Sequence, residues 1–220
     1  IIAPSTGNLG LLHSLPARGI PVVAIDRQPP GLDVPLIGID NHRAAAEAVT
    51  YLISQGHRRI GMVTGLPGLS CIADRHAGYR DALTDAGLPV DEQIISIVNS
   101  HDPVQYLQAS QSTLELLRQH PDITALFATN ADYNLGVLRA IHTTGLRCPV
   151  DISVVGFDDL EYFEFGTVPL TTVRQPAYEI GVTAFETLIR LIAGEQPPTG
   201  SINLSTEFVV RDSVRSITAG

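Results

Sequence analysis

Polar side chains follow several short apolar runs that have the character of buried strands. Four of them come at or shortly after the end of such a run: Asp26 after residues 22–25, Arg75 after 59–64, Asn130 after 123–128 and Asp158 after 152–157. Ligands of open α/β sheets bind outside the carboxyl ends of the strands, so these side chains are expected to meet at one cleft. Two carboxylates, an amide and a guanidinium suit a neutral polyhydroxylated ligand, because each hydroxyl both donates and accepts. For each residue taken singly, a helix cap or a turn is the alternative.

The sequence carries no familiar catalytic or metal-binding motif. It lacks G-x-G-x-x-G after a strand, G-x-x-x-x-G-K-[ST], G-x-S-x-G and H-E-x-x-H. The seven histidines show no metal-ligand spacing, and Cys71 and Cys148 fit neither a zinc site nor a disulfide framework. The glycine-rich loop at 65–70 is expected to be a simple turn, with phosphate binding at a helix N-terminus as the alternative. We therefore predict a protein that is not an enzyme and uses no metal or cofactor.

Two further sets of residues are interpreted as structural. Asp158 and Asp159 are adjacent, which could suggest an acid and base pair. Neighbours on an extended backbone point to opposite sides, so at most one of them is expected to enter a given pocket, and a hydrolytic pair is not predicted. His57, within the segment 56–60, is expected to hold the chain between a helix end and a strand.

The composition limits the partners of this chain. Its 220 residues are 44 % hydrophobic, which is enough for one large domain or two smaller lobes. The net charge of −9 argues against direct contact with DNA or an anionic membrane, which would need a surplus of cations on one face. No apolar run approaches the roughly 20 residues of a membrane span. A cytoplasmic location is expected, and Ile1-Ile2 resembles the tail of a buried strand, as in a fragment of a longer protein.

Strand-like runs alternate with helical patterns from Pro21 onward, as in parallel sheets covered by helices. Strands are predicted at 22–25, 36–39, 59–64, 94–98, 123–128, 152–157, 171–173 and 202–210. Helices are predicted at 43–55, 73–86, 104–119, 133–144 and 176–193. Asp40 or Asn41 is expected to cap the first of these helices, with Gly56 and Gly145 as helix ends. The sequence thus belongs to the α/β class.

Six segments together resemble the effector domain of lactose-repressor/galactose-repressor (LacI/GalR) family bacterial transcription regulators. In the order and spacing of that family, the chain has IDN at 39–41, GHRRI at 56–60, DRHAGY at 74–79, SVVGFDD at 153–159, PLTTVRQP at 169–176 and EFVVRDS at 207–213. The resemblance covers nearly the whole chain. It implies a two-lobed, periplasmic-binding-protein-like (type I) fold in which three crossover strands join two parallel sheets flanked by helices.

The resemblance also implies a division into lobes and a set of ligand residues. Residues 1–39 and 176–203 would form an N-terminal lobe whose first part is absent, and residues 40–175 and 204–220 a C-terminal lobe. The positions that match effector-facing positions of the family are Asp26, Arg75, Asn130, Asp158 and Gln175. Where the family commonly has Asn-Asp, this chain has Asn130-Ala131. Tyr106 is the nearest candidate for the aromatic side chain that often stacks on a sugar.

The function implied is ligand sensing and dimerisation in a DNA-binding repressor. The effector would be a sugar or related polar metabolite, and operator DNA would be bound by an N-terminal headpiece outside this chain. The apolar turn with Leu160, Tyr162, Phe163 and Phe165 is either a homodimer interface or core packing. A periplasmic sugar-binding protein of a transporter is the alternative function.

Overall fold

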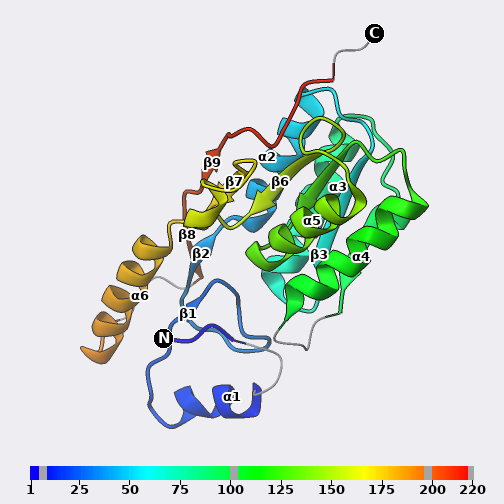
Figure 1. Cartoon of the computed structure of the whole chain (residues 1–220). Coiled ribbons are helices and arrows are strands. Elements are labelled where there is room, and N and C mark those ends of the chain that lie inside the picture. Colours follow the sequence, from blue (N-terminus) through cyan, green and yellow to red (C-terminus); the bar gives the residue numbers. More distant parts are fainter. Residues whose placement is uncertain (5–8, 100–103, 196–199, 218–220) are drawn as a thin grey trace.

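Two parallel sheets, each with its own helices, make up this computed structural model, which describes residues 1–4, 9–99, 104–195 and 200–217. Figure 1 shows a smaller lobe around α1 and α6 and a larger lobe around the second sheet. The first sheet has the order β1-β2-β8 and the second β4-β3-β5-β6-β7-β9. All pairs are parallel except β7 with β9. The predicted α/β class and two-lobed fold are therefore confirmed.

The first lobe contains α1 (Leu9–Ala17), β1 (Ala24–Ile25), β2 (Leu36–Ile39), α6 (Ala177–Ile192) and β8 (Ser201–Leu204). The second lobe contains the remaining elements: α2 (Asn41–Ser54), β3 (Ile60–Gly65), α3 (Ser70–Asp85), η1 (Glu92–Ile94), β4 (Ile95–Val98), α4 (Gln105–Gln119), β5 (Ala125–Ala128), α5 (Ala131–Thr144), β6 (Ser153–Phe157), η2 (Glu161–Phe163), β7 (Thr171–Arg174) and β9 (Glu207–Val209). The chain passes between the sheets at residue 40, at 175–176 and at 205–206.

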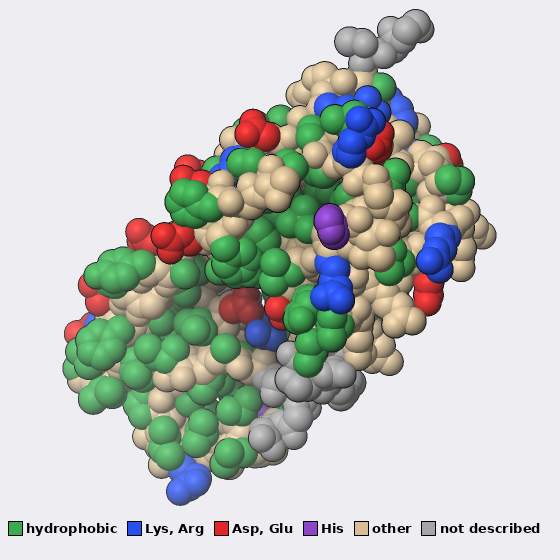
Figure 2. All heavy atoms as spheres, viewed as in Figure 1, with side chains coloured by type: hydrophobic (Ala, Val, Ile, Leu, Met, Phe, Trp, Pro, Cys, Tyr) green, Lys and Arg blue, Asp and Glu red, His purple; other side chains and the backbone are tan. Residues whose placement is uncertain are grey.

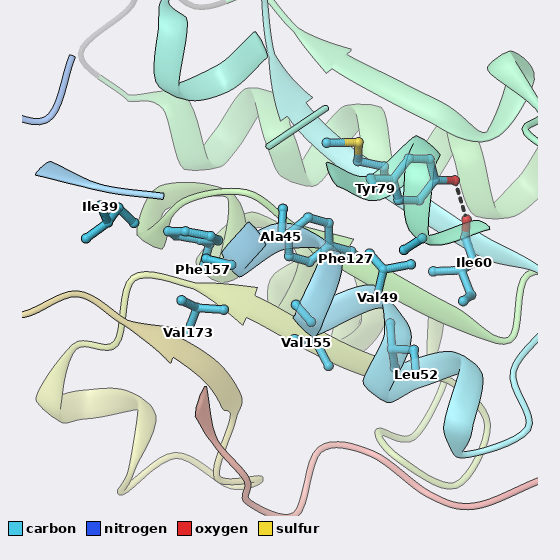
Figure 3. Close-up of a cluster of buried hydrophobic side chains, with 14 of the residues drawn as sticks. Ile39, Ala45, Val49, Leu52, Ile60, Tyr79, Phe127, Val155, Phe157 and Val173 are labelled. Carbon is cyan, nitrogen blue, oxygen red and sulfur yellow. Dashed lines mark hydrogen bonds between the residues drawn. The ribbon is translucent and has the colours of Figure 1, made fainter. Parts of the chain in front are cut away.

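Alternating strand residues divide the core of the second lobe into two layers. Met62 and Phe127 face the cluster that contains the buried side of α2, whereas Val63 and Leu126 face the cluster on the side of α4 and α5. This follows from the two-residue period of a strand. Figure 3 shows the first cluster, where the Tyr79 hydroxyl donates to the Ile60 carbonyl at 2.7 Å. The central strands are thereby held from both faces.

A glycine allows α2 and α3 to pack closely together. A Cβ at Gly78 would lie 2.2 Å from the carbonyl oxygen of His42, a distance that no side chain tolerates. The two helices consequently meet backbone to backbone, which brings Arg75, one turn away on α3, close to Asn41 at the start of α2. The helix pair positions the guanidinium that the site requires.

One helix begins, and another ends, at a residue that the sequence predicted. The Asp40 carboxylate caps α2 by accepting from the Arg43 backbone N–H at 2.9 Å, and Gly145 ends α5 with φ 77°. His57 is buried and bonds to Thr124 Oγ1 at 2.9 Å and to the Arg215 carbonyl at 3.2 Å. The structural role predicted for His57 is confirmed.

One helix was not predicted, and one predicted strand is wrong. Helix α1 lies before the first predicted element, and it buries none of its residues, so it lacks the apolar stripe that would mark it. The predicted single strand 202–210 is two strands, because β8 joins the first sheet and β9 the second. The predicted lobe boundaries themselves stay a prediction. Among the described residues, no helix is both long and apolar enough to cross a membrane.

Candidate functional site

A cleft of about 680 Å³ lies between the two lobes, and Figure 2 shows acidic and basic side chains inside the hollow. Its polar lining consists of Asp26, Arg27, Arg75, Gln105, Thr129, Asn130, Asp158, Asp159 and Gln175. Its apolar lining consists of Ile25, Leu69, Cys71, Ile72, Ala131, Tyr133, Leu160, Ala177 and Ile180. All of the ligand residues predicted from the sequence except Tyr106 therefore border one cavity.

Arg75 is a buried and firmly held charge in the cleft. Only 4 % of the residue is exposed, and its guanidinium lies 3.7 Å from the centre of the Phe157 ring. Arg75 Nε donates to Asn41 Oδ1 at 2.8 Å, and Nη1 donates to the Thr129 carbonyl at 2.6 Å. A guanidinium with one stacked face and two fixed bonds presents its remaining donors in one orientation.

Asp158 lies directly after β6 and carries a carboxylate that faces this cation. One carboxylate oxygen accepts from Gln175 Nε2 at 2.6 Å, and the other is 4.0 Å from Arg75 Nη1. Gln175 belongs to the crossover between β7 and α6. The acid, the amide and the guanidinium thus form one polar group at the second lobe's edge of the cleft.

Asp26 mirrors Asp158 in the first lobe. Both residues follow a strand, and both have a left-handed backbone, with φ 68° at Asp26 and 69° at Asp158. Among the described residues, these are the only non-glycine residues with positive φ. Such backbone conformations cluster at ligand sites, where the surrounding structure holds them in place. The Asp26 carboxylate lies 3.0 Å from Arg27 Nε.

Asp159 is engaged in a different way from its neighbour. Both residues border the cleft, which corrects the expectation that only one of them would, because the left-handed backbone at Asp158 is not the extended one assumed. The Asp159 carboxylate nevertheless accepts from Arg211, Thr172 and Arg174. Burial alone would raise the pKa of Asp159, but these three partners outweigh it and lower the pKa to about 2. This carboxylate is an ion-pair centre in the second lobe.

Asn130 has two roles at once. It borders the cleft, and its side-chain oxygen caps α5 by accepting from the Tyr133 backbone N–H at 2.8 Å. Tyr106, in contrast, is not among the lining residues, and the preceding Gln105 is. The aromatic residue that borders the cleft is Tyr133, which sequence reasoning missed because it lies in the first turn of α5 and has the apolar character of a core position.

Other lining residues that were missed are direct neighbours of predicted ones. Arg27 follows Asp26, and Thr129 precedes Asn130, so the ends of the strands would have indicated both. Cys71 borders the cleft from the first turn of α3, where burial raises the pKa of its thiol. The loop at 66–69 joins β3 to α3, as expected of a turn.

In the apolar turn after Asp159, one residue packs in the core and three are exposed, as an interface would require. Phe163 is buried in the core beside the α4 and α5 helices. Leu160, Tyr162 and Phe165 are exposed, with 73 % of Phe165 accessible to solvent. The dimer interface stays a prediction, and it rests on the three exposed residues.

The comparisons with known proteins agree with this geometry. Residues 49–214 match the periplasmic binding protein-like domain family. The chain is 34 % identical over 197 residues to the HTH-type transcriptional repressor CytR of Escherichia coli K12, which covers 90 % of this chain and 57 % of that protein. It is 33 % identical over 205 residues to the HTH-type transcriptional regulator CelR of Thermobifida fusca, covering 92 % and 59 %. A solved structure of a CelR–cellobiose complex is 33 % identical, with a TM-score of 0.84, over 92 % of this chain and 62 % of that one.

The fold and the cleft define a two-lobed, periplasmic-binding-protein-like ligand domain. The chain belongs to this family and is an effector-binding domain of a LacI/GalR-type regulator. It spans less than two thirds of the length of the curated relatives named above. Those relatives are regulators and not enzymes, which favours the regulator over the transport protein.

Proposed function

We propose that this domain senses a small polar effector, a sugar or a related metabolite, for a DNA-binding repressor that works in the cytoplasm. One observation carries the proposal: a left-handed aspartate from each lobe opens on the same cleft, and the buried Arg75 lies at its base. Asp26, Arg75, Asn130, Asp158 and Gln175 would contact the effector. The similarity to a regulator solved with cellobiose supports a sugar.

The charges in the cleft favour a neutral ligand. Asp26 lies beside Arg27, Asp158 lies opposite Arg75, and Asp159 is paired with Arg174 and Arg211. A strongly anionic or cationic ligand would leave one of these charges uncompensated in a partly desolvated site. A polyhydroxylated ligand can donate to the carboxylates and accept from the guanidinium and amides without adding charge.

The contacts supply a reason for an allosteric response. A ligand shifts a conformational equilibrium only by its different affinity for the two states. Asp26 belongs to the first lobe and Arg75 to the second, so an effector that touches both favours the closed arrangement. The crossovers at 40, 175–176 and 205–206 would absorb the rotation. In the homodimer of the whole protein, this movement would alter the spacing of headpieces that bind operator half-sites.

A calorimetric panel tests the ligand class directly. Cellobiose, ribose, further neutral sugars, sugar phosphates and nucleosides are titrated into the domain, and the solution after each titration is analysed for products. We expect a neutral sugar or nucleoside to bind and to remain chemically unchanged. Binding of sugar phosphates alone would refute the neutral class, and turnover of a bound sugar would refute a pure sensor.

A further inference from the structure

Asn134 is a buried polar side chain beneath the cleft that does not itself border it. It lies in the first half of α5, and none of its surface is accessible to solvent. Its side-chain amide nitrogen donates to the Phe157 carbonyl at 2.9 Å and to the Asp158 carbonyl at 3.4 Å. The amide therefore holds the two consecutive residues with which β6 enters the site.

These two carbonyls belong to the residues that give the site its shape. The Phe157 ring carries the Arg75 guanidinium on its face, 3.7 Å from the ring centre. Asp158 has φ 69° and turns its carboxylate toward Gln175. A hydrogen bond to the Asp158 carbonyl fixes the plane of the peptide after this residue, and that plane helps to determine where the carboxylate points.

The Asn134 side chain packs directly against the backbone of β6 at Gly156. A Cβ at Gly156 would lie 2.5 Å from Asn134 Oδ1 and 2.6 Å from Nδ2. Any other residue at 156 would therefore push the amide away from the end of β6. Gly156 and Asn134 form a complementary pair that lets the amide approach the backbone.

The same side chain is a poor choice for stability alone. Asn134 Oδ1 is buried, and no described residue donates to it. A buried acceptor without a donor costs free energy, whereas a small apolar residue at this position would remove that cost. The benefit of the amide must then lie in the two bonds that its nitrogen makes.

We propose that Asn134 is a positioning residue of the effector site: it touches no ligand and holds Phe157 and Asp158 in the conformation that binds one. Only the expected loss of effector affinity rests on the proposed function. Its structural content, the orientation of Asp158, is independent of the effector's identity.

The test compares Asn134→Ala with Thr113→Val, a matched change of a buried polar helical residue in α4. Thr113 is fully buried, and its hydroxyl donates within its own helix to the Ala109 carbonyl at 2.6 Å. In crystal structures of the unliganded proteins, we expect Asn134→Ala to move Asp158 out of the left-handed region and to break its bond to Gln175. Thr113→Val should leave both unchanged. If Asp158 keeps both features in Asn134→Ala, the proposal is overturned.

A second measurement uses whichever panel sugar binds the wild-type domain. Asn134→Ala should weaken that sugar about tenfold or more, with no loss of resistance to urea beyond that of Thr113→Val. In the Asn134→Ala/Asp158→Ala double variant the two losses of affinity should be less than additive, because part of the effect of Asn134 is exerted through Asp158. Fully additive losses, or unchanged affinity, would contradict this. Asn134→Ser serves for the same comparisons if the alanine variant does not fold.

The two proposals fail separately. If no panel compound binds the wild-type domain, the proposed ligand class is wrong, and the crystal structures still decide whether Asn134 orients Asp158.

Discussion

The two aspartates of the cleft share a backbone conformation but rest on very different supports. Asp158 follows β6, an interior strand of the six-stranded sheet. All five residues of β6 are buried. Asp26 follows β1, a two-residue strand at the end of a three-stranded sheet, and its carboxylate lies beside Arg27 of its own strand end. The two carboxylates are equally exposed, at 29 % and 28 %, so they differ in backbone support and not in burial. Asp158 and Asp26 are thus the anchored and the adjustable acid of one site.

This contrast suggests how one cleft can both recognise and respond. The second lobe presents Arg75, Asp158 and Gln175 in an arrangement fixed by packing, which suits discrimination between ligands. The first lobe contributes Asp26, which follows a short strand at the end of its sheet. The distance between Asp26 and the residues of the second lobe changes when the lobes rotate. Recognition would then belong mainly to one lobe and the conformational response to both.

The largest effect is expected on the anchored side. Asp158→Ala and Arg75→Ala should each weaken effector binding by about 2–3 kcal/mol, or roughly 30-fold to 150-fold, because each loses charge-assisted hydrogen bonds in a partly desolvated cleft. Titration calorimetry measures this with a sugar identified in the panel. Asp85→Ala, an exposed change on α3, is the control and should have no effect. Wild-type affinity in either cleft variant would remove that residue from the site.

A comparable effect is expected on the coupling between effector binding and operator DNA binding in the full-length protein. Effector affinity in the full-length protein should differ by about 1–3 kcal/mol with and without operator DNA, because binding energies at coupled sites are reciprocal. Fluorescence titrations at one salt concentration provide the measurement. Identical affinities would refute the repressor mechanism.

A smaller loss is expected on the adjustable side. Asp26→Ala should weaken effector binding by about 1 kcal/mol, since the carboxylate already has Arg27 as a partner and follows a short strand at the end of its sheet. It should reduce ligand-induced compaction in small-angle scattering more than Asp158→Asn does at equal saturation. If Asp26→Ala costs more affinity than Asp158→Ala, the assignment of anchored and adjustable acids is reversed.

Acid should weaken the second lobe through His57. Burial is the main reason that the pKa of His57 lies below its ordinary value of 6.5. The unfolded chain therefore takes up a proton at a higher pH than the folded chain does, and stability is lost as the pH falls below about 6.5. Urea unfolding of His57→Gln between pH 5 and 7 should show a shallower decline than the wild type. Burial also lowers the pKa of His76, so part of the decline should remain.

The smallest effect on stability is expected at the exposed turn. Phe165→Glu and Tyr162→Glu should change the free energy of unfolding by less than about 0.5 kcal/mol, as exposed positions do. In sedimentation of the full-length protein, both should nevertheless lower the dimer fraction. A dimer fraction equal to that of the wild type would place the interface elsewhere.

Much of the site could be read from local sequence because local rules govern it. Asp26, Asn130 and Asp158 follow strand ends, which parallel strands bring to one edge, whereas Arg75 reaches the same cleft from the second turn of α3. Gln175 was reached only by resemblance to a family. Tyr106 failed as a lining residue because the rotation of α4 about its axis depends on its packing against α5, where the Tyr106 carbonyl lies close to Gly136.

The sequence by itself determined the alternation of strands and helices, a cap at Asp40 or Asn41 and the helix end at Gly145. These features depend on residues within a few positions of one another. Tertiary structure decided that β8 and β9 join different sheets, that Phe163 is buried while Phe165 is exposed, and that Asn134 reaches the end of β6. Such outcomes depend on which surfaces meet across the chain, and no short segment contains that information.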